Sequence, residues 1–112
     1  MSANIAERAE MGVELSITTL TGTPTYDLIG TLLHEASVII FDNLGTVAVG
    51  VSNDGANTWK TFAAGEGLVL DLRSQQGKAQ NFAFRKGMNF YAIGAAGACD
   101  LRISYIYPEV VS

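Results

Sequence analysis

Short apolar runs separated by clusters of Asn, Asp and Gly dominate the middle of the chain, from residue 38 to residue 72. Two of these runs are joined by DNLG at 42–45, and a further turn contains NDG at 53–55. Runs of this length between such clusters are typical of strands joined by tight turns. The pattern continues on both sides and predicts eight or nine strands, at residues 14–20, 26–30, 37–41, 46–52, 58–62, 66–72, 81–84, 89–93 and 100–107.

Period-two alternation predicts which face of each strand is buried. The segment 100–107 is the longest clean example, because every second residue is large and apolar while Arg102 and Ser104 lie between them. We expect Pro108 to stop this strand, since proline has no amide donor for a ladder. The apolar face of this strand consists of Leu101, Ile103, Tyr105 and Tyr107.

Two other segments depart from simple alternation. The run 37–41 is apolar on both faces, so we expect a second sheet or a partner to cover each side. In 46–52 one face carries three valines, whereas the other carries the small residues Ala48, Gly50 and Ser52. A face of small residues predicts that something approaches it closely.

Many short strands without a long helical pattern imply an all-β antiparallel sandwich or barrel. Residues 31–35 are ambiguous between one helical turn and a continued strand. We predict a single domain of about eight strands over residues 14–112. Residues 1–13 are polar and Ala-rich, and they form either a frayed terminus or an N-terminal arm that orders on a neighbouring subunit.

The composition favours a protein that has a partner. Only 16% of the 112 residues are charged, whereas about 25% is usual, and 48% are hydrophobic. A small domain has much surface to cover, so a shortage of charge indicates apolar surface that a partner buries.

Charge and sequence features exclude several partners and compartments. The net charge of −4 argues against general nucleic-acid binding, which needs a basic face. The single Cys99 excludes an internal disulfide. The N-terminal residues lack the apolar core of a signal peptide, and no apolar run approaches the roughly 20 residues that span a bilayer. We expect a protein without a membrane contact that is made and kept inside a cell until assembly.

The residue inventory contains no convincing catalytic, cofactor or metal site. A nucleophile pair of Cys99 and His34 is conceivable, but nothing in the sequence places them together, and one His with one Cys cannot supply a four-ligand zinc set. The Asn53-Asp54-Gly55 turn lacks the further acids of a calcium loop. The stretch GAAG at 94–97 lacks the helix that must follow a phosphate loop, so both stretches are interpreted as turns.

Candidate binding residues come from a basic segment and from one tryptophan. Residues 73–86 carry a charge of +4 and no acid, which leaves −8 on the remainder of the chain. This segment is a solvated loop, a surface that docks on an acidic protein, or a weak nucleic-acid contact. Trp59 packs in the core or an interface, or forms a sugar-stacking platform with Tyr26 or Tyr91. The partner-binding candidates are therefore Arg73, Lys78, Arg85, Lys86 and Trp59.

A resemblance to a known family rests on the order of several short stretches. These are NLGTVAVG at 43–50, SNDG at 52–55, FAAGE at 62–66, LVLD at 68–71, FYAIG at 90–94 and LRI at 101–103. In this order the chain resembles small β-sandwich virion proteins of tailed bacteriophages, and most of all the capsid decoration, or staple, proteins of short-tailed phages. The resemblance covers about residues 38–107.

The resemblance implies a jelly-roll-like domain that binds the outside of an assembled coat lattice, without catalytic residues or cofactors. Its partner would be the major capsid protein. We also expect a homo-oligomer, dimer or trimer, because binding two coat subunits at once raises the effective concentration of each contact. The alternatives are a carbohydrate-binding or interaction module of a phage tail or neck protein, and a small hydrolase that uses Cys99 and His34.

Overall fold

The computed structural model of the chain describes residues 6–11, 14–71 and 84–111. The predicted strand at 81–84 therefore lies mostly outside the described residues, as do Leu72 and the candidate binding residues Arg73 and Lys78. Phe84 alone remains of that strand, and it forms an isolated antiparallel bridge with Ala36.

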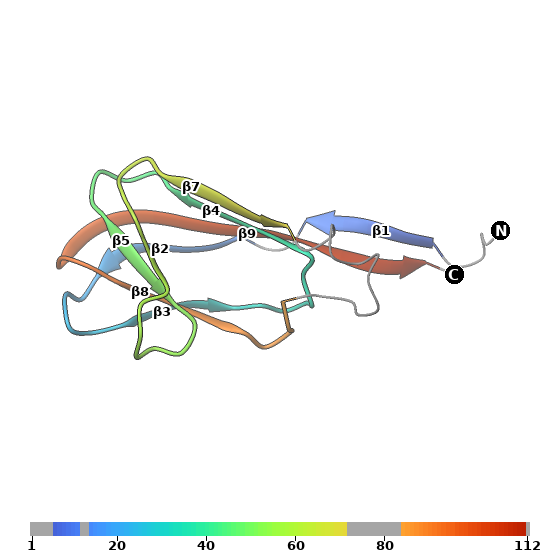
Figure 1. Cartoon of the computed structure of the whole chain (residues 1–112), viewed down its shortest axis with the longest axis horizontal. Coiled ribbons are helices and arrows are strands. Elements are labelled where there is room, and N and C mark those ends of the chain that lie inside the picture. Colours follow the sequence, from blue (N-terminus) through green and yellow to red (C-terminus); the bar gives the residue numbers. More distant parts are fainter. Residues whose placement is uncertain (1–5, 12–13, 72–83, 112) are drawn as a thin grey trace.

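The described residues form nine strands and no helix (Figure 1). One antiparallel sheet has the order β1-β9-β4-β7, with β2 also paired to β9, and the other has the order β3-β8-β5-β6. The prediction of an all-β antiparallel sandwich is confirmed. The strands are β1 (Ala6–Met11), β2 (Leu15–Leu20), β3 (Asp27–Thr31), β4 (Val38–Asn43), β5 (Val49–Ser52), β6 (Lys60–Phe62), β7 (Gly67–Asp71), β8 (Asn89–Ile93) and β9 (Gly97–Val111).

The strand pairing is that of one long hairpin rolled into two layers. β2 pairs with β9, β3 with β8, β4 with β7 and β5 with β6, so the first half of the domain runs antiparallel to the second half. The pairs β4·β9 and β5·β8 then complete the two sheets. Eight strands wound in this way form a jelly roll, and β1 adds a ninth strand along β9. The jelly-roll-like fold expected from the resemblance is confirmed.

Alternation places one apolar row of each strand between the sheets. On β9, Leu101, Ile103 and Tyr105 are fully buried, and on β4 the facing positions Ile39 and Phe41 are buried with them. These inward faces match the sequence-based predictions. The second sheet contributes a matching buried row of Val49, Val51, Phe62, Phe90 and Ala92.

The outer face of β4 is only partly covered within the chain. Val38 is buried and Ile40 is half-buried, whereas Val69, the partner of Ile40 on β7, is 58% exposed. The second sheet therefore covers one face of β4, as expected. A partner on the other face stays a prediction.

The small-residue face of β5 is approached closely by the chain itself. A Cβ placed on Gly50 would lie 3.0 Å from a methyl group of Ile93 and 3.1 Å from the methyl group of Thr58. Thr58 belongs to the loop between β5 and β6, and its hydroxyl is 2.8 Å from the hydroxyl of Tyr26. The predicted close approach is confirmed, and the approaching group is this loop.

Pro108 does not stop the last strand, contrary to the sequence-based expectation. β9 continues to Val111, and Pro108 pairs with Ala9 of β1. The carbonyl of Ile106 accepts a hydrogen bond from Ser37 on the β4 side. Because backbone groups alternate along a strand, the nitrogen of Pro108, two residues further on, also points toward the β4 side. The last pair between β4 and β9 is at Ile106, so no β4 residue requires a hydrogen bond from Pro108.

The pairing of β1 with the end of β9 makes a two-stranded ribbon that projects from one end of the sandwich (Figure 1). The molecule is accordingly long, at 53 × 23 × 21 Å. Residues 6–11 of the predicted arm thus form β1 within the same chain. Ordering of the arm on a neighbouring subunit stays a prediction.

Two loops lie at the base of this ribbon. Residues 32–35 form neither a helix nor a strand, and the loop 32–37 contacts the turn 84–88 through backbone hydrogen bonds. The ring of His34 stacks on Tyr107, with ring centroids 3.8 Å apart. We call this region, made of residues 32–37, 84–88 and 106–111, the ribbon end.

Candidate functional site

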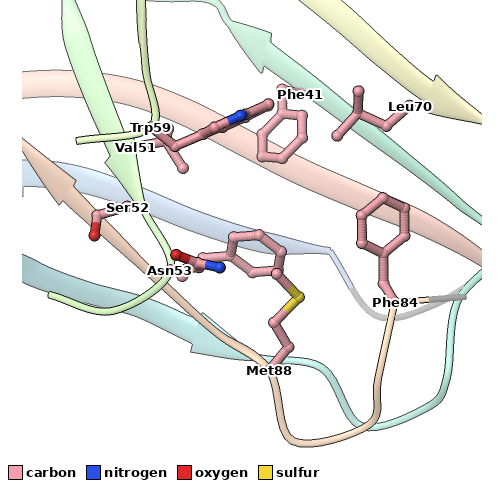
Figure 2. A pocket seen from close by; sticks show the side chains of 9 residues that line it. Phe41, Val51, Ser52, Asn53, Trp59, Leu70, Phe84 and Met88 are labelled. Atoms are coloured by element: carbon pink, nitrogen blue, oxygen red, sulfur yellow. The ribbon is translucent and has the colours of Figure 1, made fainter. Parts of the chain in front are cut away.

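An apolar pocket of about 250 Å³ opens between the two sheets near the ribbon end (Figure 2). Phe41 and Leu70 reach it from the first sheet, and Val51 and Phe90 reach it from the second. Phe84, Met88 and Trp59 come from the connecting segments and stand around these four side chains (Figure 2). Ser52 and Asn53 complete the lining.

The pocket wall is an aromatic cluster centred on Phe41. The ring of Phe41 lies 5.3 Å from that of Phe62 and 5.9 Å from that of Phe90, centroid to centroid. Trp59 joins the cluster at 5.5 Å from Phe41. Aromatic pairs at such separations attract one another beyond simple burial, so the wall is pre-formed.

Trp59 lies at the rim of the pocket rather than in the core. Its backbone N–H donates to the carbonyl of Val51 at 2.7 Å, which fixes the start of β6, but half of its surface is exposed. An exposed tryptophan beside an open apolar pocket can gain contacts from a partner without any rearrangement of the core.

The turn after β5 holds the polar side of the mouth rigid. The hydroxyl of Ser52 donates to Asp54 and accepts the backbone N–H groups of Asp54 and Gly55. The Asp54 carboxylate also accepts hydrogen bonds from Ala56 and Asn57, and these bonds hold the pKa of Asp54 well below its usual range. The expected turn is therefore present, and both Asp54 oxygens are engaged within it.

A basic edge adjoins the apolar pocket. A polar hollow of about 500 Å³, lined by Asn53 and residues 84–89, shares Asn53, Phe84 and Met88 with the pocket. Arg85 and Lys86 are exposed on this edge, and neither forms an ion pair with a residue that the structure describes. Backbone hydrogen bonds from Ala36 to Phe84 and from Gly87 to Leu32 fix the turn that carries them.

The structure brings together three of the five candidate binding residues. Trp59 stands at the rim of the pocket, and Arg85 and Lys86 form its basic edge. Arg73 and Lys78 lie outside the described residues. Sequence reasoning missed the pocket itself, although the clustering of aromatic residues at 59–62 and 82–90 was a signal that could have suggested it.

Cys99 and His34 are not brought together. The Cys99 thiol lies against the carbonyl of Ile17, 3.5 Å away, and burial followed by the nearby Asp100 charge raises its pKa. His34 stacks on Tyr107, eight positions along β9, which corresponds to about 26 Å of extended strand. A proton cannot pass directly over such a distance, so this pair cannot act as nucleophile and base.

The proposed sugar platform is not formed either. The ring contacts of Trp59 are with Phe41 and Phe62. Tyr91 lies on the outer face of its sheet, where a Cβ on Gly55 would be 3.4 Å from its ring, and the hydroxyl of Tyr26 bonds to Thr58. Any sugar stacking would therefore involve Trp59 without these tyrosines.

Comparison with known proteins adds no relative: neither the protein-family models nor the curated proteins contain a match to this chain. The described residues hold no group of three or more His, Cys, Asp or Glu side chains that could bind a metal ion. They also hold no helix long and apolar enough to cross a membrane.

Proposed function

We propose that this protein is a structural virion protein, which binds the outer surface of an assembled phage capsid and stabilises contacts between coat subunits. The observation that carries the proposal is the pocket at the ribbon end, because it suits binding and not chemistry. Among the described residues, its lining contains no acid, base or thiol, and the Ser52 hydroxyl is engaged in the turn.

The residue types at this end are those of protein interfaces. Trp, Phe, Met and Arg are enriched in interfaces relative to other protein surface, and all four types line the pocket and its basic edge. Leu33, in the neighbouring loop, is 56% exposed, which adds apolar surface at the same end. Jelly rolls are common in viral capsid proteins, and the resemblance noted above points to the same class.

A staple has to bridge subunits as well as bind them. A stable interface buries about 1,200–2,000 Å² in total, which is large for one end of a molecule only 21–23 Å across. Two or three copies that each contact a coat subunit would combine modest contacts into durable attachment. We therefore propose a dimer or trimer whose partner is the major capsid protein.

The proposal is tested by co-sedimentation with phage capsids that have been stripped of accessory proteins. We expect saturable binding at a fixed ratio to coat subunits, a higher temperature of capsid rupture, and weak binding to free coat monomers. Equal binding to free monomers would contradict the staple role, and no binding to capsids would contradict the proposed location.

A carbohydrate-binding or interaction module of a phage tail or neck protein is the second candidate, favoured by the half-exposed Trp59. Because Trp59 is the single tryptophan, its fluorescence reports the pocket rim directly. Titration of host polysaccharide should change that fluorescence if this candidate is correct. An unchanged spectrum at millimolar sugar would remove it.

A further inference from the structure

The apolar pocket and the basic hollow form one continuous site with two chemistries. They share Asn53, Phe84 and Met88 as lining residues, so a segment that fills the pocket can extend beside Arg85 and Lys86. Such a site suits an apolar group that is followed closely by negative charge.

The size of the pocket selects a side chain rather than a whole small molecule. A cavity of about 150 Å³ is known to admit benzene, whereas pockets for drug-sized ligands measure about 300–1,000 Å³. At about 250 Å³, the pocket accommodates one aromatic or branched apolar side chain. The rings of Phe41 and Phe84 offer such a side chain contact from different sides (Figure 2), and the ring of Phe90 also lines the pocket.

The hollow beside the pocket is unbalanced in charge. Arg85 and Lys86 line it, and no acidic side chain of the part of the chain that the structure describes does so. In the antiparallel bridge between Ala36 and Phe84, the residue next to Ala36 is Glu35, which is the acid nearest to Arg85 in this register. Glu35 forms no ion pair with Arg85. Carboxylates of a partner would therefore meet two cations that form no ion pair with a described residue, on a turn of fixed backbone.

We propose, building on the proposed function, that the pocket takes an aromatic or branched apolar side chain from a coat-protein segment, and that Arg85 and Lys86 bind acidic residues directly after it. Burial of the apolar side chain supplies most of the affinity, about 10- to 150-fold. The exposed ion pairs add about 3- to 10-fold and weaken with added salt.

The first test uses capsids and paired variants. Leu70→Phe adds a ring inside the pocket, whereas Leu44→Phe makes the same change at an exposed position in the turn after β4. We expect Leu70→Phe to weaken capsid binding at least 10-fold and Leu44→Phe to leave it unchanged, with both variants shown to be folded by thermal unfolding. Full binding by Leu70→Phe, or loss only in Leu44→Phe, would overturn the proposal while the proposed function stands.

Charge is tested in the same assay. Arg85→Gln with Lys86→Gln should weaken binding about 3- to 10-fold and flatten its salt dependence, whereas Arg102→Gln, which removes a cation paired with Asp100, should not. Unchanged binding and salt dependence in the double variant would overturn the acidic half of the proposal.

The second test does not depend on capsids. Three peptides are titrated into ¹⁵N-labelled protein: acetyl-Gly-Phe-Asp-Asp-amide, the same peptide with Lys-Lys, and the same peptide with Ser in place of Phe. We expect shifts of the pocket resonances with the first peptide and at least 10-fold weaker binding of the other two. If the wild-type protein does not bind capsids, the proposed function is wrong, and this titration alone then tests whether the pocket binds an apolar side chain followed by acidic residues. Equal effects of all three peptides, or no shifts at all, would overturn the inference.

Discussion

At the scale of single residues, a buried amide secures the turn that precedes β5. The Asn43 side-chain amide donates to the carbonyls of Val47, Phe62 and Ala63, and its oxygen accepts the backbone N–H of Gly45. Asn43 is 1% exposed, and its bond to the carbonyl of Phe62 is fully buried, so that carbonyl relies on Asn43 rather than on water. One residue thereby ties the β4–β5 loop to the β6–β7 turn.

Asn43→Leu should lower the free energy of unfolding by about 1–3 kcal/mol, because it removes the side-chain donor to the buried Phe62 carbonyl. Urea unfolding measures the change. Asn53→Ala, at an exposed asparagine, is the control and should change stability by less than about 0.5 kcal/mol. Equal stability of Asn43→Leu and wild type would contradict the structural role of the amide.

Substitution of Trp59 distinguishes a role of this residue in binding from a role in folding. Truncation of a fully buried tryptophan costs about 3–5 kcal/mol, but Trp59 is half exposed. Trp59→Ala should therefore cost less than about 2 kcal/mol of unfolding free energy and reduce capsid binding at least 10-fold. Urea unfolding and co-sedimentation measure the two effects. A large loss of stability with unchanged capsid binding would assign Trp59 to the core.

At the scale of elements, alternation in the sequence predicts the strands and their buried faces well. The inward row of β9 and the outward position of Val69 both follow from period two. Strand order does not follow, because β2 and β9 pair across most of the chain length. The prediction that Pro108 ends the strand was wrong. Pro108 is tolerated because β4 ends before it, so no neighbouring strand on that side needs a hydrogen bond from its nitrogen, and the sequence does not show where β4 ends relative to β9.

The pocket illustrates a different limit of prediction from sequence. Its lining comes from four strands and two connecting segments, so no local pattern contains it. Arg85 and Lys86 could be identified as binding candidates because a cluster of basic residues is visible in a short stretch of the sequence. Their position beside the pocket depends on the bridge between Ala36 and Phe84, a pairing that the sequence does not display.

The close contact between β5 and the loop that follows it gives a test at the element scale. Gly50→Val should destabilise the protein by about 1–3 kcal/mol, since its side chain would collide with Ile93 and Thr58. Ala48→Val, at an exposed position just before β5, should be neutral within about 0.5 kcal/mol. Thermal unfolding compares the two variants. Equal stabilities would contradict the packing of this loop on the sheet.

At the scale of the whole molecule, the core lies in the sandwich and the proposed attachment surface lies at one end of it. The buried hydrophobic side chains in the described part of the chain come from Leu20 to Tyr105. The ribbon of β1 with the end of β9 lies beyond that core (Figure 1). The ribbon, the basic edge and the pocket mouth all lie at or next to the ribbon end, which makes this end the expected face toward the capsid.

Removal of residues 1–11 should therefore leave the sandwich folded and weaken its attachment. We expect cooperative thermal unfolding with a midpoint within about 5 °C of wild type, because the core side chains that the structure describes, from Leu20 to Tyr105, are all retained. Capsid binding should fall, because the ribbon loses one of its two strands. Loss of cooperative unfolding would show that β1 belongs to the folding unit.

The most direct test of the central claim is a comparison of electron cryomicroscopy reconstructions of stripped phage capsids with and without the added protein. We predict extra density on the outer surface, at junctions between coat subunits, with the ribbon end and the pocket mouth facing the lattice. Density elsewhere on the particle, or a jelly roll seated with the pocket toward solvent, would contradict the account.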